Sequence, residues 1–188
     1  MIQSGTGFSR DTLIGGDGND TITGGAGADT ITLGAGTDVV IIDSVANSTG
    51  TTFDTITDFL SGTDKINITL TTSDSNFDVS GFAVVSNFND GQVSLSTSRG
   101  DAFYSTADGK LYVDDNGSGS INASLDHVVS IAAVAAADIN FAITGGASAN
   151  VIVGGAGADT ITGVGGVDTI TGGAGADTIV LASNAGAG

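Results

Sequence analysis

The chain has 188 residues, of which 31 are glycine and none is proline or cysteine. Its formal net charge is −17 with only four basic residues, and all 21 acidic residues are aspartate. Such a charge argues against nucleic-acid binding, and the lack of cysteine excludes disulfides and thiolate sites. No apolar run is long enough to span a membrane, and the first residues lack the pattern of a cleavable signal peptide.

A nine-residue repeat, Gly-Gly-x-Gly-x-Asp-x-Ile-x, organises the first part of the chain. It reads GGDGNDTIT at 15–23 and GGAGADTIT at 24–32, with weaker copies from Thr6 and Leu33. Each unit ends in a polar–apolar–polar triplet, which suits a short strand with one buried side chain. A fixed period of this kind predicts a solenoid from about Thr6 to Ile42. The predicted core residues are Leu13, Ile22, Ile31 and Val40.

The residue types of the repeat favour calcium. Two units are expected to form one turn of a flattened roll, which brings together residues eighteen apart: Asp11 with Asp29, Asp20 with Asp38, Asn150 with Asp168, and Asp159 with Asp177. Two carboxylates ~5 Å apart repel by roughly 3 kcal/mol at an effective dielectric of ~20. Calcium prefers oxygen ligands at flexible turns, so we expect several calcium ions to be part of the fold.

The nine-residue period is lost after Asp43 and returns in altered form at 53–59 and 61–67. Both segments keep an aspartate followed by an apolar residue but lose the paired glycines. We interpret them as closing turns of a first domain, residues 1–67. Asp54 and Asp64 are then either further metal ligands or turn-forming aspartates without metal.

The middle segment, residues 68–144, has no repeat and is predicted to be rich in strands. Strands are expected at Asp78–Val85 and Gln92–Ser96. A hairpin is expected between Ala102–Ser105 and Leu111–Val113, because Asp108-Gly109 is a strong turn signal.

Two further features belong to the end of this segment. Asp114 to Ile121 resembles the first eight positions of an EF-hand loop, but Leu125 stands where the bidentate glutamate belongs. Metal binding and a simple glycine-rich turn both remain open there. The alanine-rich stretch from Val128 to Asp138 predicts one short helix.

The repeat returns in a third domain, residues 145–188, with units from Gly145, Gly154, Gly163 and Gly172. Catalytic chemistry is harder to find. His127 is the one histidine and is expected to be an ordinary residue near the end of a strand or helix. With no cysteine and no HExxH motif, we expect no enzymatic activity.

The GGxGxD units, the segment DTITDFLSGTDKINI and the segment AFYSTADGKLYVDDNGSGS resemble the RTX repeat domains of proteins exported by bacterial type I secretion. The resemblance implies an all-β fold with parallel β-roll blocks flanking a β-rich middle segment. It also implies calcium-dependent folding at an extracellular or cell-surface location, reached without an N-terminal signal peptide.

Carried over position by position, this resemblance implies carboxylate ligands at Asp11, Asp20, Asp29, Asp38, Asp159, Asp168 and Asp177. Backbone ligands would come from the glycine loops that contain Gly15, Gly18, Gly24, Gly27, Gly36, Gly154, Gly157, Gly166, Gly172 and Gly175. The sequence departs from the motif at Ser9, Leu33 and Asn150, where a glycine, a glycine and an aspartate are expected.

Three functions follow from this interpretation. The first is a structural module of a secreted surface protein, such as a surface layer, that polymerises through open solenoid ends; truncation is the rival explanation of those ends. The second is the non-catalytic tail of a secreted hydrolase similar to serralysin. The third is an adhesin or ice-binding domain. Ice binding is considered because Thr-x-Thr pairs such as Thr21/Thr23 recur, although β-propensity explains these pairs equally well.

Overall fold

The structure is a computed structural model that describes residues 1–3, 8–43, 48, 52–71, 76–78, 82–85, 102–114 and 126–181. The predicted all-β class is confirmed: the described residues form seventeen strands and one 3₁₀ turn, η1 (Ala136–Asp138). Among the described residues, no helix is long and apolar enough to cross a membrane.

The first roll consists of seven short parallel strands. They are β1 (Ile2–Gln3), β2 (Thr12–Asp17), β3 (Thr21–Thr23), β4 (Thr30–Ala35), β5 (Val39–Ile42), β6 (Asp54–Ile56) and β7 (Lys65–Thr71). Successive strands alternate between two sheets, and Leu13 faces Ile31 while Ile22 faces Val40. The predicted turn of eighteen residues is thus confirmed. The roll begins earlier than the predicted Thr6, because β1 pairs with β3.

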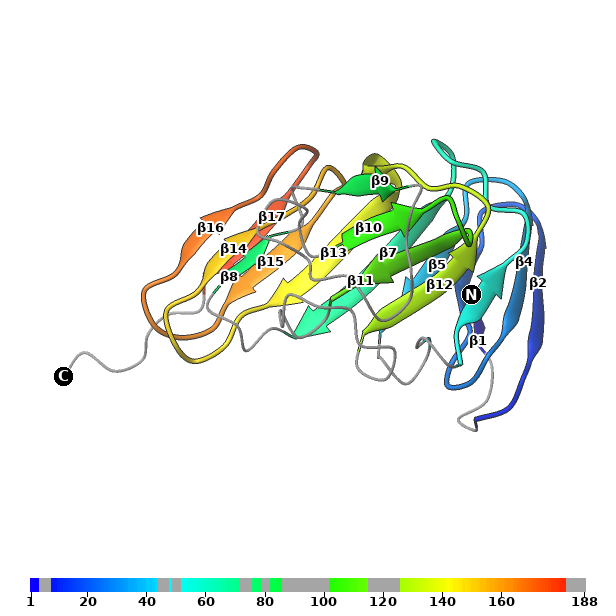
Figure 1. Ribbon diagram of the computed structural model, residues 1–188, viewed down its shortest axis with the longest axis horizontal. Coiled ribbons are helices and arrows are strands. Elements are labelled where there is room, and N and C mark those ends of the chain that lie inside the picture. The colour runs from blue at the N-terminus through cyan, green and yellow to red at the C-terminus, as the bar shows by residue number, and fades with distance from the viewer. Residues whose placement is uncertain are drawn as a thin grey trace.

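One sheet runs the length of the molecule in the order β1-β3-β5-β7-β13-β15-β17 (Figure 1). Its last three strands are β13 (Ile139–Thr144), β15 (Thr160–Gly163) and β17 (Thr178–Leu181). Since β7 pairs directly with β13, the two repeat blocks share this sheet and follow one another along it. The predicted boundary after residue 67 falls inside β7, and the one after 144 falls directly behind β13.

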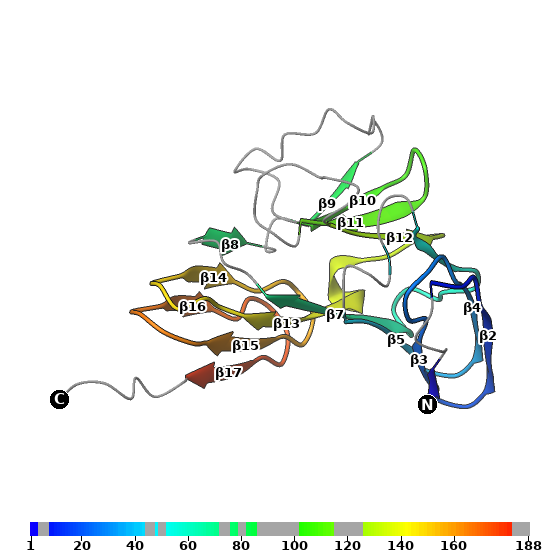
Figure 2. The same cartoon turned by 90° about the horizontal axis from the view of Figure 1, so that it is seen from below.

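The second roll closes on a smaller sheet. In it β14 (Val151–Val153) lies between β16 (Thr169–Thr171) and β8 (Asn76–Asp78), all parallel (Figure 2). The middle segment therefore contributes β8 to the second roll. The predicted single strand over Asp78–Val85 is wrong, because β8 ends at Asp78 and β9 (Ala83–Val85) belongs to a different sheet.

The rest of the middle segment extends the second sheet of the first roll, in the order β2-β4-β6-β12-β11-β10-β9. The predicted hairpin is confirmed by antiparallel β10 (Ala102–Ser105) and β11 (Lys110–Val113), with Gly109 at φ 67° in the turn. The short helix predicted within Val128–Asp138 is present as the 3₁₀ turn η1 at the end of this stretch, while β12 (His127–Ile131) occupies its first part. There β-branched residues pair with β6 and β11, and tertiary packing overrides helix propensity. Gln92–Ser96 and residues 115–121 lie outside the described residues.

The core of the rolls is a row of aliphatic side chains from each sheet. All four predicted core residues are buried, with Ile22, Ile31 and Val40 at 0% exposure and Leu13 at 5%. The row continues through the junction into the second roll with Ile66, Ile143 and Ile161. It opens at β17, where Ile179 is 47% exposed. The fold thus holds the glycine–aspartate turns along both edges of one long core.

Candidate metal centre

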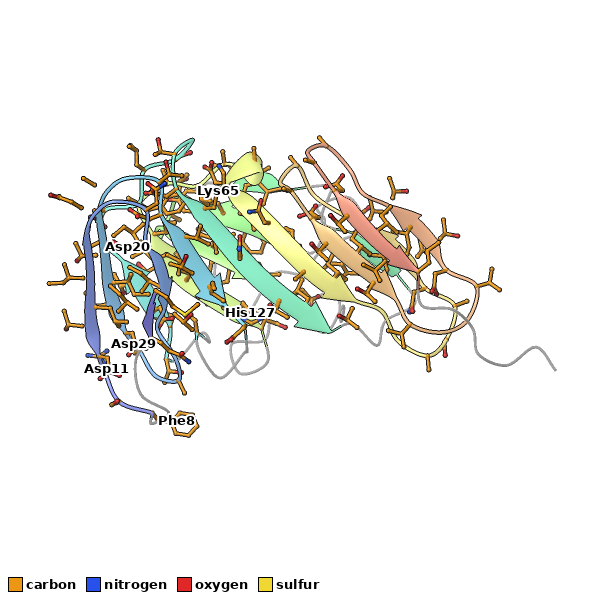
Figure 3. The ribbon with its side chains drawn as sticks, turned by 180° about the vertical axis from the view of Figure 1, so that it is seen from behind. Phe8, Asp11, Asp20, Asp29, Lys65 and His127 are labelled. Atoms are coloured by element: carbon orange, nitrogen blue, oxygen red, sulfur yellow. The ribbon has the colours of Figure 1, made fainter. Side chains whose placement is uncertain are left out.

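Each predicted aspartate stands at the entrance to a strand, because the repeat places it directly before the polar–apolar–polar triplet. Asp11 precedes β2, Asp20 precedes β3, Asp29 precedes β4 and Asp38 precedes β5. In the second roll the same holds for Asp159, Asp168 and Asp177. Figure 3 shows Asp11 and Asp29 together in the first roll, with Asp20 apart from them. The aspartates therefore line up along the edges of the rolls.

The aspartates of successive turns are joined by a ladder of hydrogen bonds. The Oδ1 atom of each accepts a bond from the backbone N–H of the residue eighteen positions earlier. These distances are 2.8 Å from Asp11 to Asp29, 2.8 Å from Asp20 to Asp38, 3.0 Å from Asn150 to Asp168 and 3.0 Å from Asp159 to Asp177. All four predicted pairs are confirmed as neighbours.

The ladder continues past the end of the regular repeat. The Asp29 N–H donates to Asp54 Oδ1 at 2.9 Å, and the Asp38 N–H donates to Asp64 Oδ1 at 3.0 Å. Beyond Asp54 the ladder ends on a hydroxyl: the Asp54 N–H donates to Ser48 Oγ at 2.7 Å, and Ser48 Oγ donates to the Val128 carbonyl. Asp54 and Asp64 thus occupy the place of the next aspartate in the ladder, although they follow by 25 and 26 residues.

The second carboxylate oxygens of the first roll are buried without partners. Oδ2 of Asp20, Asp29, Asp38 and Asp54 accepts no hydrogen bond from any described residue. The two ion pairs among the described residues join Lys65 to Asp138 and Lys110 to Asp108, so neither neutralises the ladder. A buried anionic oxygen without donor or cation is strongly unfavourable. The residues present therefore fit hard cations such as calcium, which would supply the missing charge.

The pKa values of three aspartates also indicate that their charge needs a cation. Burial and, to a smaller extent, the Asp29 charge raise the pKa of Asp54 to about 7, although the hydrogen bond from the Asp29 N–H lowers it. Burial likewise raises the pKa of Asp29 and of Asp159. Burial therefore disfavours the ionised form of these carboxylates, and a bound cation would stabilise that form and lower their pKa values.

The glycines let successive turns stack in direct backbone contact. A Cβ on Gly34 would lie 2.0 Å from the Gly16 carbonyl oxygen, and one on Gly36 would lie 2.1 Å from the Gly18 carbonyl oxygen. In the second roll a Cβ on Gly175 would lie 2.0 Å from the Gly157 carbonyl oxygen. Of the predicted glycines, Gly15 lies in β2; the others lie between strands: Gly18, Gly24, Gly27, Gly36, Gly154, Gly157, Gly166, Gly172 and Gly175.

The second roll uses its first aspartate differently. Asp159 Oδ1 accepts from the Phe141 N–H at 2.7 Å, and its Oδ2 accepts from the Gly155 N–H at 2.7 Å. Phe141 occupies the aspartate position of the preceding turn. Asp168 and Asp177 are only half-buried, so water reaches them. Asp159 and Asp177 lie together on the long sheet and Asp168 lies beside Asn150 on the small sheet, as predicted. None of these three aspartates has a buried oxygen that lacks a partner among the described residues.

Three polar residues support the turns but were missed by the sequence analysis. Asp58 accepts from the N–H groups of Leu33 and Gly34 at 2.7 and 2.9 Å. Asn19 Oδ1 accepts from the Thr37 N–H at 3.0 Å, and Asn140 Oδ1 accepts from the Ala158 N–H at 2.9 Å, each across eighteen residues. That shared offset was the available signal for the asparagines. Asp58 follows Asp54 in the segment where the repeat returns.

His127 is the first residue of β12 and is 1% exposed. Burial lowers its pKa to about 4, against smaller raising effects of the Thr69 backbone and the Asp43 charge. Among the described residues, no three histidine or acidic side chains surround one point. A cation on the ladder would therefore be held by two carboxylates together with backbone oxygens.

The family described as "RTX calcium-binding nonapeptide repeat (4 copies)" has a sequence model that matches residues 6–40 and 144–179. These two stretches are the blocks that carry the ladders. No curated protein matches the chain.

Proposed function

Because the two blocks are RTX calcium-binding nonapeptide repeats, which mark a calcium-binding module of a secreted bacterial protein, we propose that this chain is a non-catalytic structural part of a surface protein. Its rolls would fold outside the cell on binding several calcium ions. The four buried, partnerless Oδ2 atoms of the first roll are the observation that supports this proposal.

The physical argument is one of coupled folding and binding. Stacking the turns brings carboxylates together in a chain of net charge −17, and the ladder has no basic partner among the described residues. A preformed site is absent from an unfolded chain, so the free energy of ion binding becomes free energy of folding. Calcium accepts irregular oxygen cages, whereas magnesium demands tight octahedral geometry and holds its water.

Circular dichroism tests this proposal directly. We expect a mostly disordered spectrum in a chelator and strong strand signal at millimolar calcium, with magnesium a poor substitute. Equal strand content with and without calcium would contradict the proposal. The matched control is sodium at equal ionic strength, which screens repulsion but supplies no divalent ion.

A second candidate role is self-assembly, and complementary ends of the ladder favour it. At one end the Asp20 carboxylate accepts no hydrogen bond from the described residues. At the other end the N–H groups of Asp168 and Asp177 donate to no described acceptor. A carboxylate at one end and N–H groups at the other, each without a partner in the described part of the chain, are what one ladder needs to continue into another.

The strands agree with this candidate. Within the described residues, β1 and β17 are the edges of the long sheet, and Ile179, Val180 and Leu181 of β17 are 47%, 44% and 76% exposed. A contact between β17 of one molecule and β1 of the next would extend the sheet and would not close on itself.

Light scattering at rising calcium tests self-assembly. We expect particles that grow with calcium and with protein concentration, and that stay small in Ile179→Asp, which puts a charge on the exposed edge. Leu60→Asp, at a side chain that is 61% exposed in the turn between β6 and β7, is the comparison for charge alone. A folded chain that stays monomeric would instead favour the tail of a secreted hydrolase or an adhesin.

A further inference from the structure

We propose that Asp29 and Asp54 together bind a calcium ion beside Gly24, in a site that bridges the break in the nine-residue repeat, whereas Asp64 binds none. Asp54 lies outside the residues that match the repeat family. The inference rests on the proposed calcium-dependent fold and divides two aspartates that the sequence alone treats alike.

The two carboxylates face one small space. A Cβ on Gly24 would lie 3.0 Å from Asp29 Oδ2 and 3.0 Å from Asp54 Oδ2. The aspartates are 1% and 0% exposed, and neither Oδ2 atom has a hydrogen-bond partner among the described residues. Their Oδ1 atoms are already fixed by the N–H groups of Asp11 and Asp29. Each side chain is therefore held by one oxygen and presents the other.

The break in the repeat does not displace Asp54. It follows Asp29 by 25 residues instead of the usual 18, yet Thr30 still faces Thr55 and Ile31 still faces Ile56. Ser48 secures this position by accepting from the Asp54 N–H and donating to the Val128 carbonyl. The extra residues are thus accommodated in the connection, and Asp54 stands where the next repeat would put its aspartate.

Asp64 is the counterpart of Asp54 on the long sheet, and its carboxylate is fully used. Its Oδ1 accepts from the Asp38 N–H at 3.0 Å and its Oδ2 accepts from the Leu60 N–H at 2.8 Å. The N–H groups of Thr63 and Asp64 donate to the Leu60 carbonyl, which completes a closed turn. Both oxygens of Asp64 therefore accept a hydrogen bond, whereas Asp54 Oδ2 accepts none from the described residues.

An ion could reach Asp29 from solvent. A cavity of about 290 Å³ opens beside this residue, and its lining includes Asp11, Phe53 and Thr55. Asp11 is itself linked to Asp29 through the ladder. The cavity thus leads from solvent to Asp29, one of the two proposed ligands, and Arg10 also lines it.

The test is the number of calcium ions bound per chain, measured by equilibrium dialysis with elemental analysis, with circular dichroism as the check of fold. Asp54→Asn keeps an acceptor for the Asp29 N–H, and the protein already tolerates asparagine at this phase in Asn150. We expect Asp54→Asn to bind one ion fewer than the wild type at saturating calcium. Asp64→Asn is expected to bind the wild-type number.

A second variant tests the same space without removing charge. Gly24→Ala places a methyl group against both Oδ2 atoms, and Gly24 has no positive φ that alanine would strain. We expect it also to lose one ion. Its control is Gly155→Ala, where the nearest atom to the new methyl is 3.5 Å away on the Phe141 ring.

The outcomes separate the two proposals. Wild-type stoichiometry in both Asp54→Asn and Gly24→Ala would overturn the site, and loss of an ion in Asp64→Asn would overturn the division between the two aspartates. If Asp54→Asn does not fold, the comparison of Gly24→Ala with Gly155→Ala decides. A wild-type chain that folds without binding any calcium would instead refute the proposed function.

Discussion

The two rolls are built from the same repeat and the same register, but their carboxylates are in different states. In the first roll Asp20, Asp29 and Asp38 each bury an Oδ2 atom that has no hydrogen-bond partner within the described part of the chain. In the second roll Asp159 has both oxygens bonded to backbone N–H groups, while Asp168 and Asp177 reach solvent. The sequence of a repeat unit therefore does not determine how its own aspartate is buried and hydrogen-bonded.

The difference comes from what stands one turn away. Asp29 and Asp38 follow a turn that carries another aspartate, so negative charge accumulates along the edge. Asp159 follows a turn that carries Phe141 in the same place, and a ring atom of Phe141 lies 3.5 Å from where a Gly155 Cβ would be. We infer that the first roll depends on cations more strongly than the second.

The largest expected effect is the response to calcium removal. Hydrogen exchange, measured with and without a chelator, should show that the first roll loses protection at β2–β5 before the second roll loses it at β13 and β15. The reason is that unneutralised buried charge destabilises the first roll more, because both oxygens of the buried Asp159 accept backbone N–H groups. Simultaneous loss of protection in both rolls would show that the different hydrogen bonding of Asp159 and Asp38 does not change how strongly each roll depends on calcium.

The next effect concerns His127 in β12, where the middle segment extends the second sheet of the first roll. His127 begins β12, which pairs with β6, and its pKa in the folded chain is about 4 against 6.5 in the unfolded chain. The unfolded chain therefore binds more protons between these values, and the free energy of unfolding falls as the pH drops from 6.5 towards 4. The full loss is about 3 kcal/mol, at ~1.4 kcal/mol per pH unit.

Denaturant unfolding at pH 7 and pH 5 in saturating calcium measures this dependence. His127→Gln should show a smaller fall in stability than the wild type, while the carboxylates titrate in both proteins. Identical pH dependence would mean that His127 is solvated in solution. Because the side chain is buried, we also expect His127→Ala to destabilise the fold through a cavity, without changing calcium stoichiometry.

The smallest expected effect has opposite signs in the two rolls. Asp38→Asn removes a partnerless buried charge and should raise strand content and thermal stability in a chelator. Asp159→Asn removes the acceptor of the Gly155 N–H and should lower stability by about 1–3 kcal/mol, with or without calcium. Thermal unfolding followed by circular dichroism measures both. A change in thermal stability of the same sign in both variants would contradict the inferred difference between the two rolls.

The parts of the fold that repeat at a fixed period were predictable from the sequence. The core residues Leu13, Ile22, Ile31 and Val40 and the aspartate pairs follow from a nine-residue period that each repeat block keeps along its length. Register in stacked strands is set by neighbours one turn away, and those neighbours are themselves copies of the motif. Hence one unit predicts the next.

The parts that depend on contacts between unlike segments were not predictable. Asp58 supports the turn at Leu33 only because an irregular connection places it there. The pairing of β7 with β13 joins residues with no common motif. The different states of Asp54 and Asp64 depend on the Leu60 N–H, which comes from a local turn and not from the repeat.

The junction between β7 and β13 has a consequence for what the roll can carry. Lys65 and Asp138 are bonded neighbours although 73 residues separate them, whereas an ordinary turn takes 18. Loop-closure entropy grows only with the logarithm of length, so the longer excursion costs roughly 1 kcal/mol more than a regular turn. Lys65, Ser61 and Gly62 all bond the Asp138 carboxylate and fasten the point of return. The roll can therefore carry a long insertion between two adjacent turns at little entropic cost, but a replacement insertion would have to supply strands in place of β8, which pairs with β14, and of β12, which pairs with β6.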